Sequence, residues 1–407
     1  MISFNNIVDR LTKSPSDDLL KALVDCVERN ELTDEDLAYL TMRLAESGDV
    51  IHQSDKCTSA DVASTGGPSS LSTLLCPLYL RALGYTVPKL AVPGRPAGGI
   101  DVFAQIPGYK IEFTAAEVNS LLRKSGYVHF LASRYFVPLD AALFSFRRQS
   151  NKINIPGLAI ASLLAKKKAA GVSLVGLDVR VALHGNFGQS REAASQNACR
   201  FCRVASLLGC QALCFLSDAS NPYQPFIGRG ESLVALFQIL SGQADTWLRK
   251  HDDMCYAMAH RLALIKSIGD CSVRPTPKTL LSVLNENLEA QGSSSDQFEQ
   301  YVFDIQNKHR LRITAPSDGF LHVNLESLRT VIVYLQELTA TVERPFSDPC
   351  GIILKCKQGT YVHKGEIIAS VRCLDHFSEK MLLGLESALQ VSREPVPNLF
   401  FNEVGHE

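Results

Sequence analysis

The chain reads Asp61-Val62-Ala63-Ser64-Thr65-Gly66-Gly67 where an apolar segment gives way to a predicted helix at residues 74–83. The Ser-Thr-Gly-Gly turn in this run offers two hydroxyl groups and unobstructed backbone N–H groups near a helix N-terminus, an arrangement that binds phosphate. From about residue 55 onward, apolar runs alternate with helical segments and glycine-rich turns. Residues 173–179 predict one buried strand, and residues 194–208 predict the helix behind it. This alternation indicates an α/β layer with a mainly parallel sheet.

The chain has 407 residues, which is enough for two or three hydrophobic cores. Its sequence pattern divides it into three regions. Residues 1–54 show helical periodicity and predict a helical domain. Residues 55–290 predict the α/β domain. After a polar break at residues 291–296, short apolar runs between glycine turns predict a C-terminal β-rich α+β domain over residues 300–407. The predicted fold class is therefore α/β multidomain, with a helical domain, a mainly parallel sheet and a C-terminal mixed domain.

The balance of charge limits the class of partner. With 41 basic and 42 acidic residues, the chain has no large field of one sign. We therefore expect a small-molecule partner, with no nucleic acid polymer and no membrane. The first residues lack a basic segment followed by an apolar one, and no eighteen apolar residues run uninterrupted. These features predict a cytoplasmic protein.

Twelve cysteines are spread along the chain, which fits buried thiols in a reducing compartment. Four of them, Cys199, Cys202, Cys210 and Cys214, are close enough in sequence to be weighed as zinc ligands. Their surroundings read as a helix followed by a strand, so we interpret them as structural thiols and predict no metal site.

A helical segment that begins near Pro156 carries Ser162 and Lys166 four residues apart, which places both on one face. Arg147 precedes Ser162 by fifteen residues. A pyrimidine has two carbonyl oxygens on either side of an N3–H group, so an Arg and a Lys can donate to the oxygens while a Ser hydroxyl accepts from the nitrogen. The alternative interpretation is a solvated basic helix end in Lys166-Lys167-Lys168.

Together, the Ser-Thr-Gly-Gly turn and the set Arg147, Ser162 and Lys166 resemble the thymidine phosphorylase/pyrimidine-nucleoside phosphorylase family. That family's turn reads Asp-Lys-His-Ser-Thr-Gly-Gly, and its base-binding Arg, Ser and Lys have this spacing. The resemblance spans nearly the whole chain. It implies a helical domain completed by a segment around residues 140–172, an active cleft between this domain and the α/β domain, and a homodimer formed through the helices. It also implies pentosyl transfer from a pyrimidine nucleoside to phosphate, with phosphate as co-substrate and no required cofactor.

The resemblance also assigns the base side of the site. Arg147, Ser162 and Lys166 would hold the pyrimidine, and Arg147 and Lys166 would act in catalysis by stabilising the departing base. Phe144 and Phe187 would be apolar walls for the base. Packing in the core explains either phenylalanine equally well.

On the phosphate side, the resemblance assigns contacts to Ser64, Thr65, Gly66 and Gly67, and a second hydroxyl contact to Ser72 or Thr73. Two family residues are replaced, because the lysine and histidine of the motif fall on Val62 and Ala63. Ile100 stands where the family's next loop has a threonine. Loss of a lysine to a dianion removes about 1.5–3 kcal/mol of charge-assisted bonding. The missing charge could come from Arg95, Lys56 or His184, each of which could instead be a loop anchor or a solvated side chain.

Three functions are consistent with these residues. The first is phosphorolysis of a pyrimidine nucleoside. The second is cleavage of the glycosidic bond by water, or by a phosphate that the substrate itself carries, and it is motivated by Val62, Ala63 and Ile100. The third is pyrimidine binding without catalysis.

Overall fold

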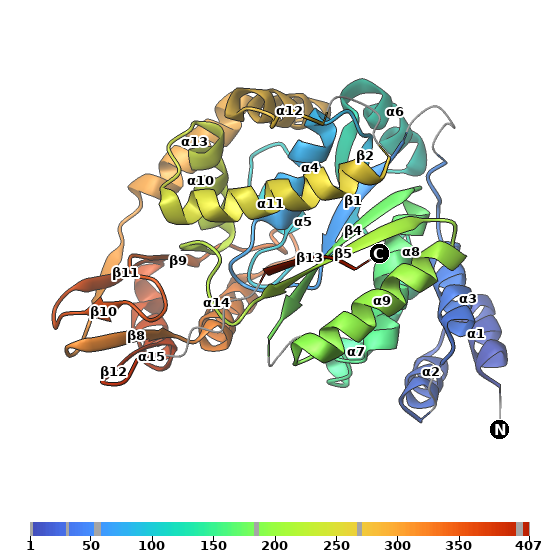
Figure 1. The fold of residues 1–407 in the computed structure, drawn as a ribbon, viewed down its shortest axis with the longest axis horizontal. Helices are drawn as coiled ribbons and strands as arrows, with labels where there is room; N and C mark the ends of the chain where they lie inside the picture. The colour runs from blue at the N-terminus through green and yellow to red at the C-terminus, as the bar shows by residue number, and fades with distance from the viewer. Residues whose placement is uncertain are drawn as a thin grey trace.

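The computed structural model describes residues 3–29, 32–52, 58–182, 187–266 and 271–395, and the backbone of residues 402–406. Lys56 and His184 lie outside these residues. The central sheet contains three parallel strands and one antiparallel strand in the order β1-β4-β5-β13 (Figure 1). These strands are β1 (Ala60–Ser64), β4 (Leu174–Val181), β5 (Gln211–Asp218) and β13 (Asn402–His406). The predicted mainly parallel sheet is confirmed.

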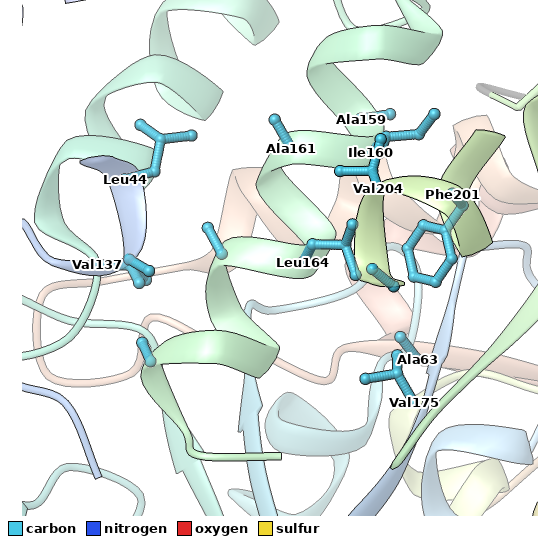
Figure 2. Close-up of a cluster of buried hydrophobic side chains, with 14 of the residues drawn as sticks. Leu44, Ala63, Val137, Ala159, Ile160, Ala161, Leu164, Val175, Phe201 and Val204 are labelled. Atoms are coloured by element: carbon cyan, nitrogen blue, oxygen red, sulfur yellow. The ribbon is translucent and has the colours of Figure 1, made fainter. Parts of the chain in front are cut away.

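A layer of helices lies on one side of this sheet (Figure 1). They are α1 (Phe4–Lys13), α2 (Asp17–Arg29), α3 (Asp34–Ala45), α7 (Pro138–Gln149), α8 (Pro156–Ala169) and α9 (Arg191–Leu207). Helix α8 is apolar on most of its circumference and packs on α3, and its Lys167 pairs with Asp61 of β1. Figure 2 shows Leu164 of α8, Ala63 of β1 and Val175 of β4 in one cluster of buried side chains. One continuous core therefore joins the helices to the sheet.

A second core lies on the other side of the sheet. It is built from α4 (Ser72–Ala82), α5 (Gly99–Phe103), α6 (Ala115–Ser125), α10 (Arg229–Leu240), α11 (Thr246–Ile265), α12 (Pro277–Ala290) and α13 (Ser295–Asn307), with the parallel pair β2 (Val87–Ala91) and β3 (Tyr127–Leu131). Helix α4 confirms the helix predicted at residues 74–83. Within the polar break at residues 291–296, a turn ends α12 and Ser295 begins α13, which packs back on α10 and α12. The α/β unit therefore extends to Asn307.

The C-terminal region forms a third core between two antiparallel sheets. One sheet contains β6 (Phe226–Ile227), β9 (Cys350–Leu354), β11 (Ile367–Cys373) and β7 (Leu311–Thr314), and the other contains β10 (Tyr361–Val362), β8 (Gly319–Val323) and β12 (Leu389–Ser392). Helices α14 (Leu325–Thr339), η1 (Asp375–Phe377) and α15 (Ser378–Ala388) complete it.

The predicted boundaries of this domain need two corrections. Strand β6 joins its sheet from residue 226, far before residue 300, because Ile227 pairs with Ile352. Strand β13 leaves the domain and pairs with β5, where its backbone supplies hydrogen bonds to the edge of the central sheet. No helix in the described part of the chain is long and apolar enough to cross a membrane.

Candidate active site

The Ser-Thr-Gly-Gly turn lies at the carboxyl end of β1, next to β4. Its geometry depends on two glycines with positive φ, +99° at Gly66 and +138° at Gly67. A Cβ at Gly66 would meet nothing within 4 Å, whereas a Cβ at Gly67 would lie 3.1 Å from Nη1 of Arg180. The turn is therefore open at Gly66, and at Gly67 it needs the space that only a glycine leaves.

Arg180 of β4 is the cation at this turn, and sequence reasoning missed it as a site residue. Its backbone N–H donates to Oγ1 of Thr65 (2.9 Å), Nη2 donates to Oγ of Ser72 (3.0 Å) and Nη1 donates to the carbonyl of Gly67 (3.3 Å). Among the described residues, these contacts and those with Asp178 leave one Nη1 hydrogen without an acceptor. The alternation of Asp178, Val179 and Arg180 at the end of a buried strand was the available signal, since residues i and i+2 share a face.

The remaining predicted phosphate residues are placed as follows. Oγ of Ser64 accepts from the N–H of Gly66 (3.1 Å), which shapes the turn. Oγ of Ser72 donates to Oδ2 of Asp178 (2.7 Å), so Ser72 joins the site at the start of α4. Thr73 follows on α4, with its backbone carbonyl against Gly99.

A buried lysine cluster, which we define as Asp61, Lys89 and Lys167, lies behind the turn. Nζ of Lys89 donates to Oδ1 of Asp61 (2.8 Å) and to the carbonyl of Val62 (2.8 Å), and Nζ of Lys167 is paired with Oδ2. Burial would raise the pKa of Asp61, but the charges of Lys167 and Lys89 outweigh it and lower this pKa to about 2. Lys167 is therefore not part of a solvated helix end.

On the base side, the structure brings Ser162 and Lys166 together on α8, as their spacing predicted. Nζ of Lys166 donates to Oγ and to the carbonyl of Ser162 (2.9 Å each) and is paired with Oδ2 of Asp140 on α7 (2.5 Å). The three ammonium hydrogens are thereby engaged, so a bound base must displace at least one of these contacts. Asp140 was not predicted, because it is 26 residues from its partner.

Arg147 is buried at the end of α7 and contacts the loop that leads to α8. Nε donates to the carbonyl of Lys152 (3.1 Å) and Nη2 to the carbonyl of Ile153. Three of its five N–H groups find no acceptor within the part of the chain that the structure describes. Burial lowers the pKa of Arg147 to about 10, against the opposing charge of Asp140, so the guanidinium stays protonated at neutral pH.

The two phenylalanines differ in their surroundings. Phe144 is half-buried on α7, one turn before Arg147. Phe187 is fully buried, with its ring centroid 6.2 Å from that of Phe201. The structure thus encloses Phe187 in the core shared by α9 and the sheet, whereas Phe144 keeps part of its surface exposed.

Arg95 is attached to the C-terminal domain rather than to the turn. Its guanidinium forms an ion pair with Glu337 of α14, and the neighbouring carbonyl of Pro96 accepts from Nε2 of Gln336 (2.8 Å). Oδ1 of Asp101 closes the loop by accepting from the N–H of Gly94 (2.8 Å). The loop-anchoring interpretation of Arg95 agrees with these contacts.

Cavities lie elsewhere in the described part of the chain, and two of them are as follows. One of about 870 Å³ lies in the C-terminal domain between β7 and β12, and one of about 500 Å³ lies between α9 and the segment before α3. Neither is lined by a predicted site residue. Among the four clustered cysteines, Sγ of Cys202 and Sγ of Cys214 are 3.7 Å apart, and Cys210 donates to the carbonyl of Val172. Within the described ranges, no group of three or more His, Cys, Asp or Glu side chains is arranged to hold a metal ion.

Comparison with known proteins gives full-length similarity at low identity. The chain is 24% identical to the pyrimidine-nucleoside phosphorylase of Geobacillus stearothermophilus, over 98% of this chain and 95% of that protein. It is 24% identical to the pyrimidine-nucleoside phosphorylase of Bacillus subtilis, over 86% of this chain and 83% of that protein. No family model matches the chain.

Among solved structures, the chain is similar to anthranilate phosphoribosyltransferase from Saccharomyces cerevisiae in complex with PRPP and Mg. The TM-score is 0.50 at 11% identity, and the match covers 75% of this chain and 94% of that chain. This likeness is one of fold. The full-length similarity confirms the resemblance and makes the chain a divergent relative of the pyrimidine-nucleoside phosphorylases.

Proposed function

We propose that this chain is a pentosyltransferase that cleaves a pyrimidine nucleoside with phosphate. The observation that carries the proposal is the presence of two cationic sites, one at the carboxyl end of the sheet and one on the α7–α8 pair, on elements that share one core. The Ser-Thr-Gly-Gly turn holds Arg180, and the α7–α8 pair holds Lys166 and Arg147. Phosphorolysis needs an anion-binding group on one side of the sugar and a cation on the side of the departing base.

The proposed reaction has one bond formed and one broken. A phosphate held by the turn attacks C1′, the bond from C1′ to the base nitrogen breaks, and its electron pair leaves with the base. Lys166 and Arg147 would stabilise the resulting pyrimidine anion, and their two positive charges exceed the single negative charge of Asp140. At the turn, the open position at Gly66 and the remaining Nη1 hydrogen of Arg180 support phosphate binding. The reaction needs no cofactor.

We propose that the helical layer separates from the sheet to admit substrate and closes to bring base and phosphate together. The ion pair between Lys167 of α8 and Asp61 of β1 is a contact that such a movement would break. A homodimer and a cytoplasmic location remain part of the proposal. The amphipathic helices do not by themselves support the dimer, since Ile7, Leu11 and Leu23 use the apolar faces within this chain.

The test is base release from pyrimidine nucleosides and their monophosphates, followed by chromatography with and without phosphate. We expect release that depends on phosphate and falls at least a hundredfold in Lys166→Met, because the departing base loses its cation. Lys168→Met is the matched control, since Lys168 lies on the same helix and donates to the carbonyl of Leu208. Phosphate-independent release would favour the hydrolytic reading, and base binding without turnover would favour the non-catalytic one.

A further inference from the structure

The buried lysine cluster carries an excess of positive charge in the interior. Exposure is at most 5% for its three side chains, and one carboxylate faces two ammonium groups. Two titratable neighbours, Tyr127 and His129, add no charge to the cluster, and the positive charge of Lys166 also acts on Lys167. Burial raises the pKa of Tyr127 well above its ordinary value, and burial together with the charge of Lys89 lowers the pKa of His129 well below its ordinary value. With both ammonium groups protonated the cluster has a net charge of +1; burial lowers the pKa of Lys167, and the charge of Asp61 opposes this shift.

Such an excess is costly to bury, because a second ammonium loses its hydration without gaining a carboxylate of its own. A fold that needed only to neutralise Asp61 would require one lysine. The second lysine is consistent with a partner anion from outside the chain. The nearest place for that anion is the Ser-Thr-Gly-Gly turn, since Ser64 follows Asp61 by three residues of extended strand, roughly 10 Å.

We propose that the buried lysine cluster supplies the positive charge that draws the phosphate dianion to the Ser-Thr-Gly-Gly turn, in place of the lysine that Val62 replaces. This inference rests on the proposed function and names the source of its phosphate affinity. Lys89 and Lys167 act as positioning residues through the field and through β1, whose Val62 carbonyl Lys89 holds. In this proposal the turn and Arg180 contact the phosphate directly.

The cluster also connects the phosphate side of the site to the base side. Lys166 and Lys167 are neighbours on α8, but Lys166 is paired with Asp140 on α7 while Lys167 is paired with Asp61 on β1. Movement of α8 away from the sheet would therefore remove one charge from behind the turn. Phosphate affinity is highest in the closed arrangement.

The experiment measures binding of inorganic phosphate and, separately, of a pyrimidine base to the full chain by calorimetry. Lys89→Met and Lys167→Met each reduce the cluster to zero net charge, and each is expected to raise the Kd for phosphate by about tenfold or more. The Kd for the base should stay within about threefold. Lys168→Met, which removes a lysine of α8 outside the cluster, should change neither Kd.

A double variant separates charge from packing. Asp61→Asn combined with Lys89→Met restores a net charge of +1 while it removes more native contacts. We expect the Kd of the double variant for phosphate to be closer to the wild-type value than the Kd of either single variant. Phosphate binding that is weaker in the double variant than in the single variants would overturn the inference. Equal losses of affinity for phosphate and for the base in the single variants would also overturn it, as would an intact chain that binds no phosphate.

Thermal unfolding tests whether each variant is folded, and either single lysine variant alone suffices for the charge comparison. The two proposals can fail separately. If the variants weaken phosphate binding but no nucleoside is cleaved, the proposed function fails and the charge assignment stands. If nucleosides are cleaved and the Kd for phosphate is the same in all variants, the charge assignment fails and the proposed function stands.

Discussion

At the scale of single residues, Arg180 joins the Ser-Thr-Gly-Gly turn to the sheet and to α4. It bonds Thr65, Gly67 and Ser72 with one side chain and its own backbone N–H. It also pairs with Asp178, whose Oδ1 is buried without a hydrogen-bond partner among the described residues. The side chain of an Arg held in this way is already ordered before a ligand binds. Anion binding therefore costs little further conformational entropy, which favours high affinity.

Replacing Arg180 should therefore affect phosphate more than nucleoside. We expect Arg180→Met to raise the KM for phosphate by about tenfold or more, because a charge-assisted bond contributes roughly 1.5–3 kcal/mol. The KM for nucleoside should stay within about threefold. Steady-state kinetics with each substrate varied in turn measures both values, and Arg123→Met, on the exposed face of α6, is the control. Equal rises in the two KM values would contradict a role at the phosphate side.

His251 gives a pH dependence of stability. Its Nε2 accepts from the N–H of Leu71 (2.7 Å) at the start of α4, and burial, with the charge of Arg180, lowers its pKa to about 3. The unfolded chain has an ordinary histidine pKa near 6.5. Below that pH the unfolded state binds the proton and the folded state does not, so stability is complete above about pH 6.5 and is lost as the pH falls toward 3.

The expected contribution of His251 is about 1.4 kcal/mol of unfolding free energy per pH unit. Urea unfolding between pH 7.5 and pH 5 measures this slope. His251→Gln keeps an acceptor for Leu71 but does not titrate, so its slope should be smaller by about that amount. An unchanged slope would show that His251 is protonated in the folded chain.

At the scale of helices and strands, the sequence pattern predicted contacts between residues that are close together in the sequence. The four-residue spacing on α8 predicted that Ser162 and Lys166 share a face, and the bond between them follows from helix geometry alone. The same spacing could not reveal the partner of Lys167, because Asp61 is 106 residues away on another element. A run of three lysines predicts solvent-exposed side chains as long as the carboxylates that pair with them are not known. The partner of Arg95 could not be predicted for a similar reason, since Glu337 is 242 residues away.

Strand β13 covers an edge that would otherwise be open. It pairs with β5 antiparallel, with Asn402 opposite Ser217 and Glu403 opposite Leu216. The sequence pattern placed this segment in the C-terminal domain, because a short terminal strand carries no signal for a distant partner. An uncovered edge strand is a template for pairing with another chain.

Truncation of residues 396–407 should therefore promote self-association. We expect larger species that grow with protein concentration, measured by light scattering, while the full chain under the same conditions keeps a constant mass. A truncated chain whose mass is independent of concentration would show that the edge of β5 needs no cover.

At the scale of the whole molecule, buried ion pairs fix the C-terminal domain to the α/β domain. Arg372 of β11 binds Glu231 of α10 through Nε (2.9 Å) and Nη2 (2.7 Å), and Arg310 adds a bond of 2.9 Å to the same carboxylate. A Cβ at Gly351 would collide with Glu231, so the backbone of β9 passes directly over it. Removing one partner of a buried pair leaves an uncompensated charge.

Glu231→Gln should cost about 3–5 kcal/mol of unfolding free energy. We expect calorimetry to show a lower melting temperature and a C-terminal domain that unfolds in a transition of its own. Glu28→Gln is the control, since Glu28 pairs with Lys152 on the surface, where such pairs contribute at most about 1 kcal/mol. Similar losses in the two variants would contradict a special role for the buried pairs.

Phosphorolysis transfers the phosphate to C1′ of the sugar. Incubation of the chain with pyrimidine nucleosides and radiolabelled phosphate, followed by separation of the sugar products, detects this transfer. We expect label in a pentose 1-phosphate in equal amount to the released base, because the turn at Ser64–Gly67 delivers phosphate to C1′. Released base with unlabelled sugar would contradict phosphorolysis, and so would the absence of both products from every nucleoside tested.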